Sequence, residues 1–161
     1  MEAIIKGPVV SMGEDINTDD IIPARYLTTS VPEELAPYIF EDMAEKVEVP
    51  RGAVIVAGPN FGSGSSREHA PLALKGAGVK AILAESFARI FLRNCINIGL
   101  LAVEAPGISV IKGGEVELDL GKGRITGENG VELTVPAVPE FIGQIIDAGG
   151  LIPWIKTGGL D

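Results

Sequence analysis

The sequence predicts an α/β fold in which a parallel βαβαβ core is followed by an antiparallel β-meander. Three short apolar runs, at residues 53–57, 79–84 and 100–103, are separated by stretches of helical character. Continuous apolar runs rich in β-branched residues are typical of strands buried on both faces, as in parallel sheets. The last third carries alternating strands and glycine turns, which are typical of antiparallel hairpins. These patterns predict a mixed layer of strands and helices with a meander packed on it.

The chain before this core is expected to hold one strand and one short helix. Residues 3–10 are predicted as a strand, and residues 13–20 as a polar loop. Pro32 stands near the start of a helical turn over residues 32–37, where its fixed φ suits the first helical position. Apolar residues recur at helical spacing from 38 to 48, so this helix is predicted to continue.

The core elements then alternate. The first strand, residues 53–57, leads into a Gly/Ser-rich loop and a helix that ends at residues 76–78. After the second strand, Ser86 is expected to cap a helix over residues 87–97. Gly99 is the expected C-terminal cap of that helix, before the third strand begins.

The last third is expected to form the meander and one helix. Between Gly-Lys-Gly and Glu-Asn-Gly turns, three strands are predicted, over residues 115–120, 124–126 and 131–135. Residues 139–148 are predicted as a helix that Gly149 and Gly150 close. No linker interrupts the pattern, so residues 1–161 are predicted to be a single domain.

Composition argues against several classes of function. The net charge of −9 argues against a nucleic-acid partner, since phosphate binding needs clustered lysine and arginine. No apolar run reaches the ~18 residues of a membrane helix, and the start lacks the design of a signal peptide. The single cysteine, Cys95, permits no internal disulfide, so a reducing, cytoplasmic location is expected.

The chain has few of the nitrogen and sulfur ligands that could bind a metal ion. Cys95 and His69 are the only cysteine and histidine in the sequence. A structural zinc site needs about four nitrogen or sulfur ligands, and an iron–sulfur cluster is held mainly by several thiolates. The chain is therefore expected to hold no metal cofactor alone, and any metal chemistry must take its ligands from another chain.

The most unusual stretch is a Gly/Ser-rich loop, Gly62-Ser63-Gly64-Ser65-Ser66-Arg67-Glu68-His69-Ala70-Pro71, between a buried strand and a helix. Glycines let the backbone approach a ligand, and N–H groups at a helix start favour anions. Arg67 adds a planar fork suited to a carboxylate or phosphate. The pattern predicts an anion site that contains serine hydroxyls. The Walker, dinucleotide-binding and nucleophile-elbow patterns are all absent.

A purely structural interpretation of this loop stays open. Ser65 and Glu68 fit a capping box, in which both side chains bond to backbone N–H groups at a helix start. Pro71 argues against it, because a helix begun at Ser66 would lose a backbone hydrogen bond there. Either the helix starts nearer Ala70 or Pro71 kinks it. A later start would leave the serines in the loop, free to face a ligand.

Three stretches share their order along the chain with one known family. They are Gly-Ser-Gly-Ser-Ser-Arg-Glu-His-Ala at 62–70, Asn-Thr-Asp-Asp-Ile-Ile-Pro at 17–23, and Phe-Ala-Arg-Ile-Phe-Leu-Arg-Asn-Cys-Ile-Asn-Ile-Gly-Leu at 87–100. They resemble the swivelling domain of the aconitase superfamily, which includes the small subunits of isopropylmalate dehydratases. The resemblance extends along the whole chain and implies a swivelling β/β/α domain.

The resemblance implies a hydro-lyase subunit that is active only with a large subunit carrying a [4Fe–4S] cluster. The implied reaction is the isomerisation of 2- and 3-isopropylmalate in leucine biosynthesis, by dehydration and rehydration. Ser65 matches the family's base, which removes a proton from the carbon beside a carboxylate. Ser66, Arg67 and the backbone at Gly64 would hold a substrate carboxylate. Asp19 matches an acidic residue that supports a histidine of the catalytic domain, although a turn or cap role fits its local pattern nearly as well.

Other polar residues are expected to be structural. His69 is expected to pack or bond behind the loop, and Cys95 to be a small buried hydrophobe. Asn94 and Asn97 are expected to belong to a plain helix end, with hydrogen bonds to loop carbonyls as the alternative. Arg89 and Arg93 share one helix face, which is expected to be exposed, with a partner contact as the alternative.

Substrate choice is expected to depend on the segment after Tyr26-Leu27. The resemblance implies that relatives which bind a third, distal carboxylate place an arginine there, whereas this chain has Thr28 and Thr29. An unpaired carboxylate in a closed site is costly, so a dicarboxylate with a branched alkyl group is preferred to a tricarboxylate. Three alternatives stay open: a homoaconitase subunit in which Arg25 or a partner residue takes the extra carboxylate, a methyl-malate dehydratase subunit, and a non-catalytic dicarboxylate-binding module.

Overall fold

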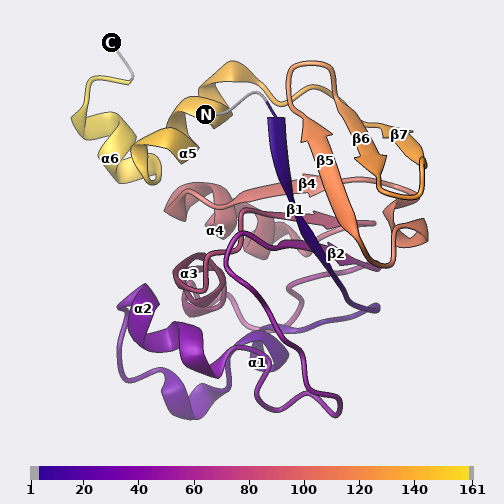
Figure 1. The fold of residues 1–161 in the computed structure, drawn as a ribbon. Helices are drawn as coiled ribbons and strands as arrows, with labels where there is room; N and C mark the ends of the chain where they lie inside the picture. The colour runs from indigo at the N-terminus through magenta and orange to yellow at the C-terminus, as the bar shows by residue number, and fades with distance from the viewer. Residues whose placement is uncertain (1–3, 160–161) are drawn as a thin grey trace.

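The computed structural model describes residues 4–159, and its strands form a seven-stranded mixed sheet (Figure 1). The strands are β1 Ile4–Ser11, β2 Val54–Ala57, β3 Ala81–Ala84, β4 Leu101–Glu104, β5 Glu115–Asp119, β6 Arg124–Gly127 and β7 Glu132–Thr134. The helices are α1 Thr18–Ile21, α2 Pro32–Leu35, α3 His69–Gly76, α4 Arg89–Ile98, α5 Glu140–Ala148 and α6 Leu151–Lys156, with 3₁₀ turns η1 Ala24–Tyr26, η2 Ala36–Tyr38 and η3 Ile108–Val110. The predicted α/β class is confirmed.

Strand β1 joins the two halves of the sheet, whose order is β4-β3-β2-β1-β5-β6-β7. Residues 9–11 of β1 pair parallel with β2, and residues 4–8 pair antiparallel with β5. The pairs β2–β3 and β3–β4 are parallel, while β5–β6 and β6–β7 are antiparallel. The parallel core and the antiparallel meander are therefore both present as predicted. The meander continues the sheet through β1.

The curl of the sheet brings the meander over one face of the parallel strands. Side chains of the parallel strands, such as Leu83 and Val103, share a buried cluster with Val116 and Ile125 of the meander. The other face of the parallel strands is buried against helices, where Ile82 packs in a cluster with residues of α3 and α4. In Figure 1 the meander lies at the upper right, and α3 and α4 lie to the left. The layers follow the β/β/α arrangement that the resemblance implied.

The helix predicted over residues 38–48 is wrong. The chain leaves η2 at Phe40, whose φ of 58° lies in the left-handed region that a helix interior does not use. The Phe40 N–H donates to the Ile21 carbonyl at 2.9 Å, instead of to the carbonyl four residues earlier. Phe40 is buried, and Met43 and Val47 pack against the same core. A tertiary hydrogen bond and apolar burial thus replace the helix that the spacing suggested.

The start of α4 and the presence of two short helices also differ from the sequence-based expectations. Helix α4 begins at Arg89, and Ser86 is not its cap, because the Ser86 Oγ accepts from the Asn60 N–H at 2.9 Å. Helices α1 and α6 were not predicted. Helix α5 ends as expected at Gly149, which has a φ of 94°. The predicted first strand includes residue 3, which lies outside the described residues.

Candidate active site

The Gly/Ser-rich loop lies between β2 and α3, and α3 begins at His69. The capping box proposed for Ser65 and Glu68 is wrong, since Glu68 occupies the cap position and makes no side-chain cap bond. The later helix start leaves Ser65, Ser66 and Arg67 in the loop. Ser65 and Ser66 are exposed, so both hydroxyls are accessible to a ligand.

Backbone contacts with the segment before α1 fix the loop in place. The Gly62 N–H donates to the Ile16 carbonyl at 2.7 Å, and the Thr18 N–H donates to the Ser63 carbonyl at 2.8 Å. Gly62 has a φ of 84°, and a Cβ there would overlap the ring of Phe91 on α4. Glycine is therefore required at this position, both for the backbone conformation and for the close approach to α4.

The Ser65 hydroxyl is held from two sides. Arg67 Nε donates to Ser65 Oγ at 2.6 Å, which is a short hydrogen bond from a permanently charged donor. Thr18 Oγ1 lies 3.4 Å from the same oxygen and accepts from the Ser65 N–H at 3.2 Å. A positive donor at this distance stabilises the alkoxide form of the serine more than the neutral hydroxyl. The arrangement suits a serine that accepts a proton.

The Arg67 guanidinium is anchored by Asp19, which lies on α1. Arg67 Nη2 lies 2.8 Å from Asp19 Oδ1, and the arginine side chain is only 18% exposed. Arg67 Nη1 is buried and has no hydrogen-bond partner among residues 4–159. An unpaired donor of this kind is rare in folded proteins and is explained when a ligand or a partner supplies the acceptor. The cap role considered for Asp19 is wrong, because Asn17 and Asp20 form the capping box of α1.

Helix α4 holds the second serine of the loop through its backbone. Asn94 Nδ2 donates to the Ser66 carbonyl at 2.9 Å, so the expectation that Asn94 belongs to a plain helix end is wrong. The Ser66 hydroxyl has no hydrogen-bond partner among the described residues and is exposed. This bond fixes the backbone of Ser66 while leaving its hydroxyl free for a ligand.

The segment expected to select the substrate lies between η1 and α2 and contacts α3, the helix that follows the Gly/Ser-rich loop. The Thr29 hydroxyl donates to Glu34 Oε2 at 2.7 Å and accepts from the Val31 N–H at 3.1 Å, so it is bonded to α2 and to the residue before it. Ser30 Oγ lies 3.4 Å from His69 Nε2, which links the segment to the first residue of α3. Thr28 is exposed. The Thr28 side chain is thus the more available of the two threonines.

Arg25 forms a bidentate ion pair with Asp42. Its Nη1 and Nη2 donate to the two Asp42 carboxylate oxygens at 2.9 and 2.7 Å. The guanidinium also lies over the Tyr26 ring, with Cζ 4.9 Å from the centroid. The bidentate hydrogen bond raises the pKa of Arg25 and lowers that of Asp42. A carboxylate of a substrate would have to displace Asp42 to use Arg25.

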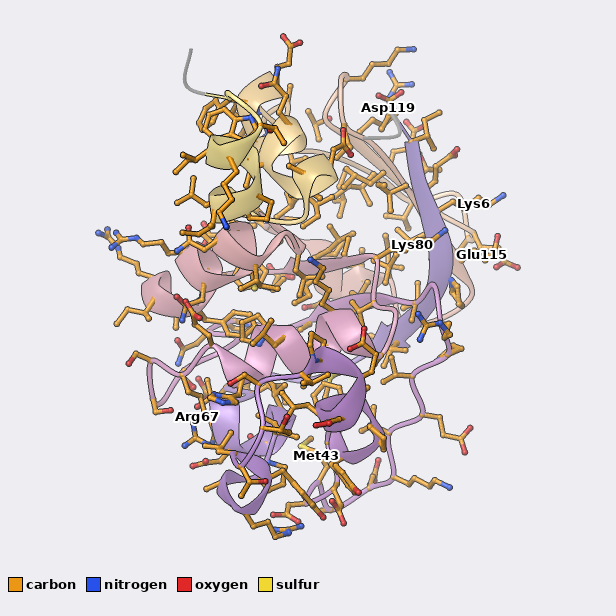
Figure 2. The ribbon with its side chains drawn as sticks, turned by 90° about the vertical axis from the view of Figure 1, so that its left-hand side faces the viewer. Lys6, Met43, Arg67, Lys80, Glu115 and Asp119 are labelled. Carbon is orange, nitrogen blue, oxygen red and sulfur yellow. The ribbon has the colours of Figure 1, made fainter. Side chains whose placement is uncertain are left out.

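Three other polar side chains singled out from the sequence, Cys95, Arg89 and Arg93, lie as expected. Cys95 is fully buried as expected, and burial raises the pKa of its thiol well above the usual range. Arg89 and Arg93 are exposed, as predicted. Within residues 4–159, no three His, Cys, Asp or Glu side chains are grouped as metal ligands. Figure 2 shows Arg67 on the opposite side of the molecule from Lys6 and Glu115, so the site lies away from the β1–β5 pair.

Sequence reasoning missed Thr18 and gave the loop contact of Asn94 only as an alternative. Thr18 is the partner of Ser65 across 47 positions, and Asn94 reaches Ser66 across 28 positions. A local signal did exist for α1, because Asn17 and Asp20 have the spacing of a capping box. That signal would have placed Thr18 at the first helical position, without revealing its contact with Ser65.

Comparison with known proteins gives a consistent family. The sequence matches the Aconitase C-terminal domain family over residues 16–107. It is 50% identical to the isopropylmalate/citramalate isomerase small subunit of Methanocaldococcus jannaschii, covering 97% of this chain and 96% of that one. It is 52% identical to the 3-isopropylmalate dehydratase small subunit of Halothermothrix orenii, covering 96% of each.

A solved structure supports the same assignment. The crystal structure of 3-isopropylmalate dehydratase (leuD) from Methanocaldococcus jannaschii superimposes with a TM-score of 0.88 at 43% identity. The match covers 98% of this chain and 96% of that one. Separately, none of the helices within residues 4–159 combines the length and apolarity needed to cross a bilayer.

Proposed function

The chain belongs to the aconitase C-terminal domain family, and from this premise we propose that it is the small subunit of a two-subunit hydro-lyase. The proposed reaction interconverts 2-isopropylmalate and 3-isopropylmalate by loss and return of water, a step of leucine biosynthesis. The support comes from relatives with that name that match almost the whole chain at about half identity. On this proposal residues 1–161 act as one swivelling domain in the cytoplasm.

The observation that carries the proposal is the geometry at Ser65. Its Oγ accepts a 2.6 Å hydrogen bond from Arg67 Nε on an exposed loop. A serine hydroxyl is a poor base unless its alkoxide is stabilised, and a fixed positive donor supplies that stabilisation. We assign to Ser65 the removal of a proton from the carbon beside a substrate carboxylate. The C–H electron pair forms the C=C bond as the hydroxyl group departs, and the net loss is one water.

Binding of the substrate carboxylate is assigned to the groups around this serine. The free Ser66 hydroxyl, the backbone of Gly64 and the Arg67 guanidinium lie in one loop. Asp19 holds the guanidinium at 2.8 Å, which orients Arg67 and leaves one of its nitrogens unpaired. The second carboxylate oxygen of Asp19 remains available to support a histidine of the partner.

The open position of the loop supports a second chain as part of the site. Gly64, Ser65, Ser66 and Asp19 are all exposed. Electrostatic stabilisation of an alkoxide is far stronger in a site from which water is excluded. A large subunit that covers the loop would provide this exclusion. A binding module that worked alone would leave these groups in water.

We also propose that the large subunit carries a [4Fe–4S] cluster. The residues of this chain do not fit such a cluster, because its single thiol, Cys95, is fully buried. When bound in the partner, the cluster would supply a Lewis acid for the substrate hydroxyl. Ser65, Ser66 and Arg67 would contribute the proton transfer and the carboxylate contacts from this side of the site.

The proposed substrate is a dicarboxylate with a branched alkyl group. A tricarboxylate such as homocitrate would need a positive group near Thr28, and the neighbouring Arg25 is already paired with Asp42. The Methanocaldococcus relative is named for citramalate as well as isopropylmalate, so a methyl-substituted malate is a second substrate to test.

Reconstitution tests this proposal directly. Dehydration of 3-isopropylmalate, citramalate and homocitrate would be followed by the ultraviolet absorbance of the unsaturated product. Each would be run with this chain alone, with an anaerobically prepared large subunit alone, and with both. We expect activity only in the mixture, with isopropylmalate turned over at least ~10-fold more efficiently than homocitrate, because the unpaired third carboxylate is penalised.

A different result would remove a defined part of the proposal. No turnover of isopropylmalate by a mixture with an intact cluster would exclude it as the substrate. Equal turnover of homocitrate would show that the third carboxylate is paired, either by Arg25 after it leaves Asp42 or by a residue of the large subunit. Tight binding of dicarboxylates by this chain alone, with no activity in the mixture, would favour the non-catalytic module.

A further inference from the structure

The only buried polar or charged residue within residues 4–159 is Thr18, which is 1% exposed. It is the first residue of α1, next to Asp19, and it lies under the Gly/Ser-rich loop. A hydroxyl buried without hydrogen bonds is destabilising, so its partners show what it does in the fold.

The Thr18 hydroxyl contacts two groups, and both belong to Ser65. Thr18 Oγ1 accepts from the Ser65 N–H at 3.2 Å and lies 3.4 Å from Ser65 Oγ. Gly64 leaves room for this contact, because a Cβ on it would lie 3.2 Å from Thr18 Oγ1. The Thr18 backbone is fixed as well, since its N–H donates to the Ser63 carbonyl at 2.8 Å. The hydroxyl is therefore held against the loop by its own main chain.

The Thr18 hydroxyl and the Ser65 hydroxyl are close enough for either one to donate to the other. The Thr18 oxygen already accepts from the Ser65 N–H, so its own hydrogen is available to donate to Ser65 Oγ. Arg67 Nε donates to the same Ser65 oxygen at 2.6 Å. If the Thr18 hydroxyl donates in this direction, Ser65 Oγ lies between two donors, the charged Arg67 Nε and the buried Thr18 hydroxyl.

We infer that Thr18 is a positioning residue that aligns Ser65 with Arg67 and stabilises the alkoxide, an inference that rests on the proposed function. It touches neither substrate nor cofactor and acts through Ser65. Its loss therefore changes how much Ser65 alkoxide forms at a given pH, and leaves the carboxylate contacts of Ser66 and Arg67 in place.

The kinetic test compares Thr18→Val, Thr18→Ser and the matched control Thr126→Val, each assembled with the large subunit. Thr126 lies in β6 of the meander, away from the loop. For Thr18→Val we expect kcat to fall about 10- to 100-fold, the effect of losing one hydrogen bond to a developing charge, with little change in KM. Because less alkoxide forms, the acidic limb of the kcat–pH profile should move to higher pH. Thr18→Ser should restore both values.

A role confined to stability gives a different pattern. It would reduce the amount of assembled complex without moving the pH profile. The kcat per assembled site would then be the same for Thr18→Ser and Thr18→Val. Either an unmoved acidic limb or an unchanged kcat in Thr18→Val overturns the inference. The control Thr126→Val should match the wild type in all three parameters.

A second measurement on the isolated full-length chain separates this inference from the choice of substrate. The Arg67 Nε–H resonance in ¹⁵N-labelled protein, identified by its loss in Arg67→Lys, reports the bond to Ser65 Oγ. In Thr18→Val its exchange with water should accelerate at least ~10-fold, since Ser65 is no longer held in place, and Thr18→Ser should reverse this. Exchange at the wild-type rate in Thr18→Val would overturn the inference. Absence of isopropylmalate turnover by the wild-type complex would contradict only the proposed function.

Discussion

Ser65→Ala is expected to reduce kcat by about 10²- to 10⁴-fold, the range contributed by a positioned general base. The substitution removes the oxygen that Arg67 Nε holds at 2.6 Å. It leaves the loop backbone bonds of Gly62 and Thr18 intact, so folding and assembly should not change. Steady-state kinetics of the reconstituted complex, with the assembled fraction measured by size-exclusion chromatography, gives the result.

The control for this variant is Ser11→Ala, in an exposed position at the end of β1. It should show wild-type kcat. A competition experiment then isolates the chemical step. Excess Ser65→Ala chain added to the wild-type complex should displace active subunits and lower the activity in proportion. Wild-type turnover by an assembled Ser65→Ala complex would remove Ser65 as the base.

Arg67→Lys is expected to lower kcat/KM by more than about 10²-fold, because one ammonium cannot replace the contacts of the guanidinium. Arg67 uses Nε for Ser65 Oγ and Nη2 for Asp19 at the same time. Lysine has a single nitrogen and loses at least one of these bonds. KM should rise through the weakened carboxylate contact, and kcat should fall through the less stabilised alkoxide.

The matched control is Arg124→Lys, at an exposed position of β6 in the meander. It preserves the same change in side-chain chemistry at a distance from the loop and should leave both parameters unchanged. An Arg67→Lys complex with wild-type kcat and KM would show that neither the serine contact nor the substrate contact depends on the guanidinium fork.

The strands of the parallel core were predictable because a short run of consecutive apolar residues indicates a buried strand by itself. The runs that became β2 and β3 are apolar without interruption, and every residue of both strands is buried. The turns of the meander were predictable for a similar reason, since glycine-containing turns separate its strands. Such signals need no knowledge of the rest of the chain.

The elements that were missed depend on contacts between distant segments. The helical spacing at 38–48 gave the wrong prediction because the Phe40 N–H bonds to the Ile21 carbonyl instead of continuing a helix. Serine is a common helix N-cap, yet the Ser86 hydroxyl accepts a hydrogen bond from the N–H of Asn60, which is 26 positions away. Helix α1 has only four residues, too short for apolar periodicity to show.

In the candidate site, too, local motifs were predictable and contacts between distant segments were not. Ser65, Ser66 and Arg67 could be proposed from the sequence because they are contiguous in an unusual loop that resembles the family's motif. The contacts of Thr18 and Asn94 with that loop appear only once α1 and α4 are folded against it. The commitment of Arg25 to Asp42 likewise required the structure, because the two are 17 positions apart along an irregular segment.

The measurement that tests the central claim most directly is hydrogen exchange at the substrate carbon. Reconstituted complexes with wild-type chain, Ser65→Ala and Ser66→Ala would be incubated with 3-isopropylmalate in D₂O, and deuterium at the carbon beside the carboxylate would be measured by mass spectrometry. If Ser65 removes the proton, the wild type incorporates deuterium, Ser66→Ala does so once enough substrate is present, and Ser65→Ala does not. Incorporation at the wild-type rate by Ser65→Ala would contradict the account.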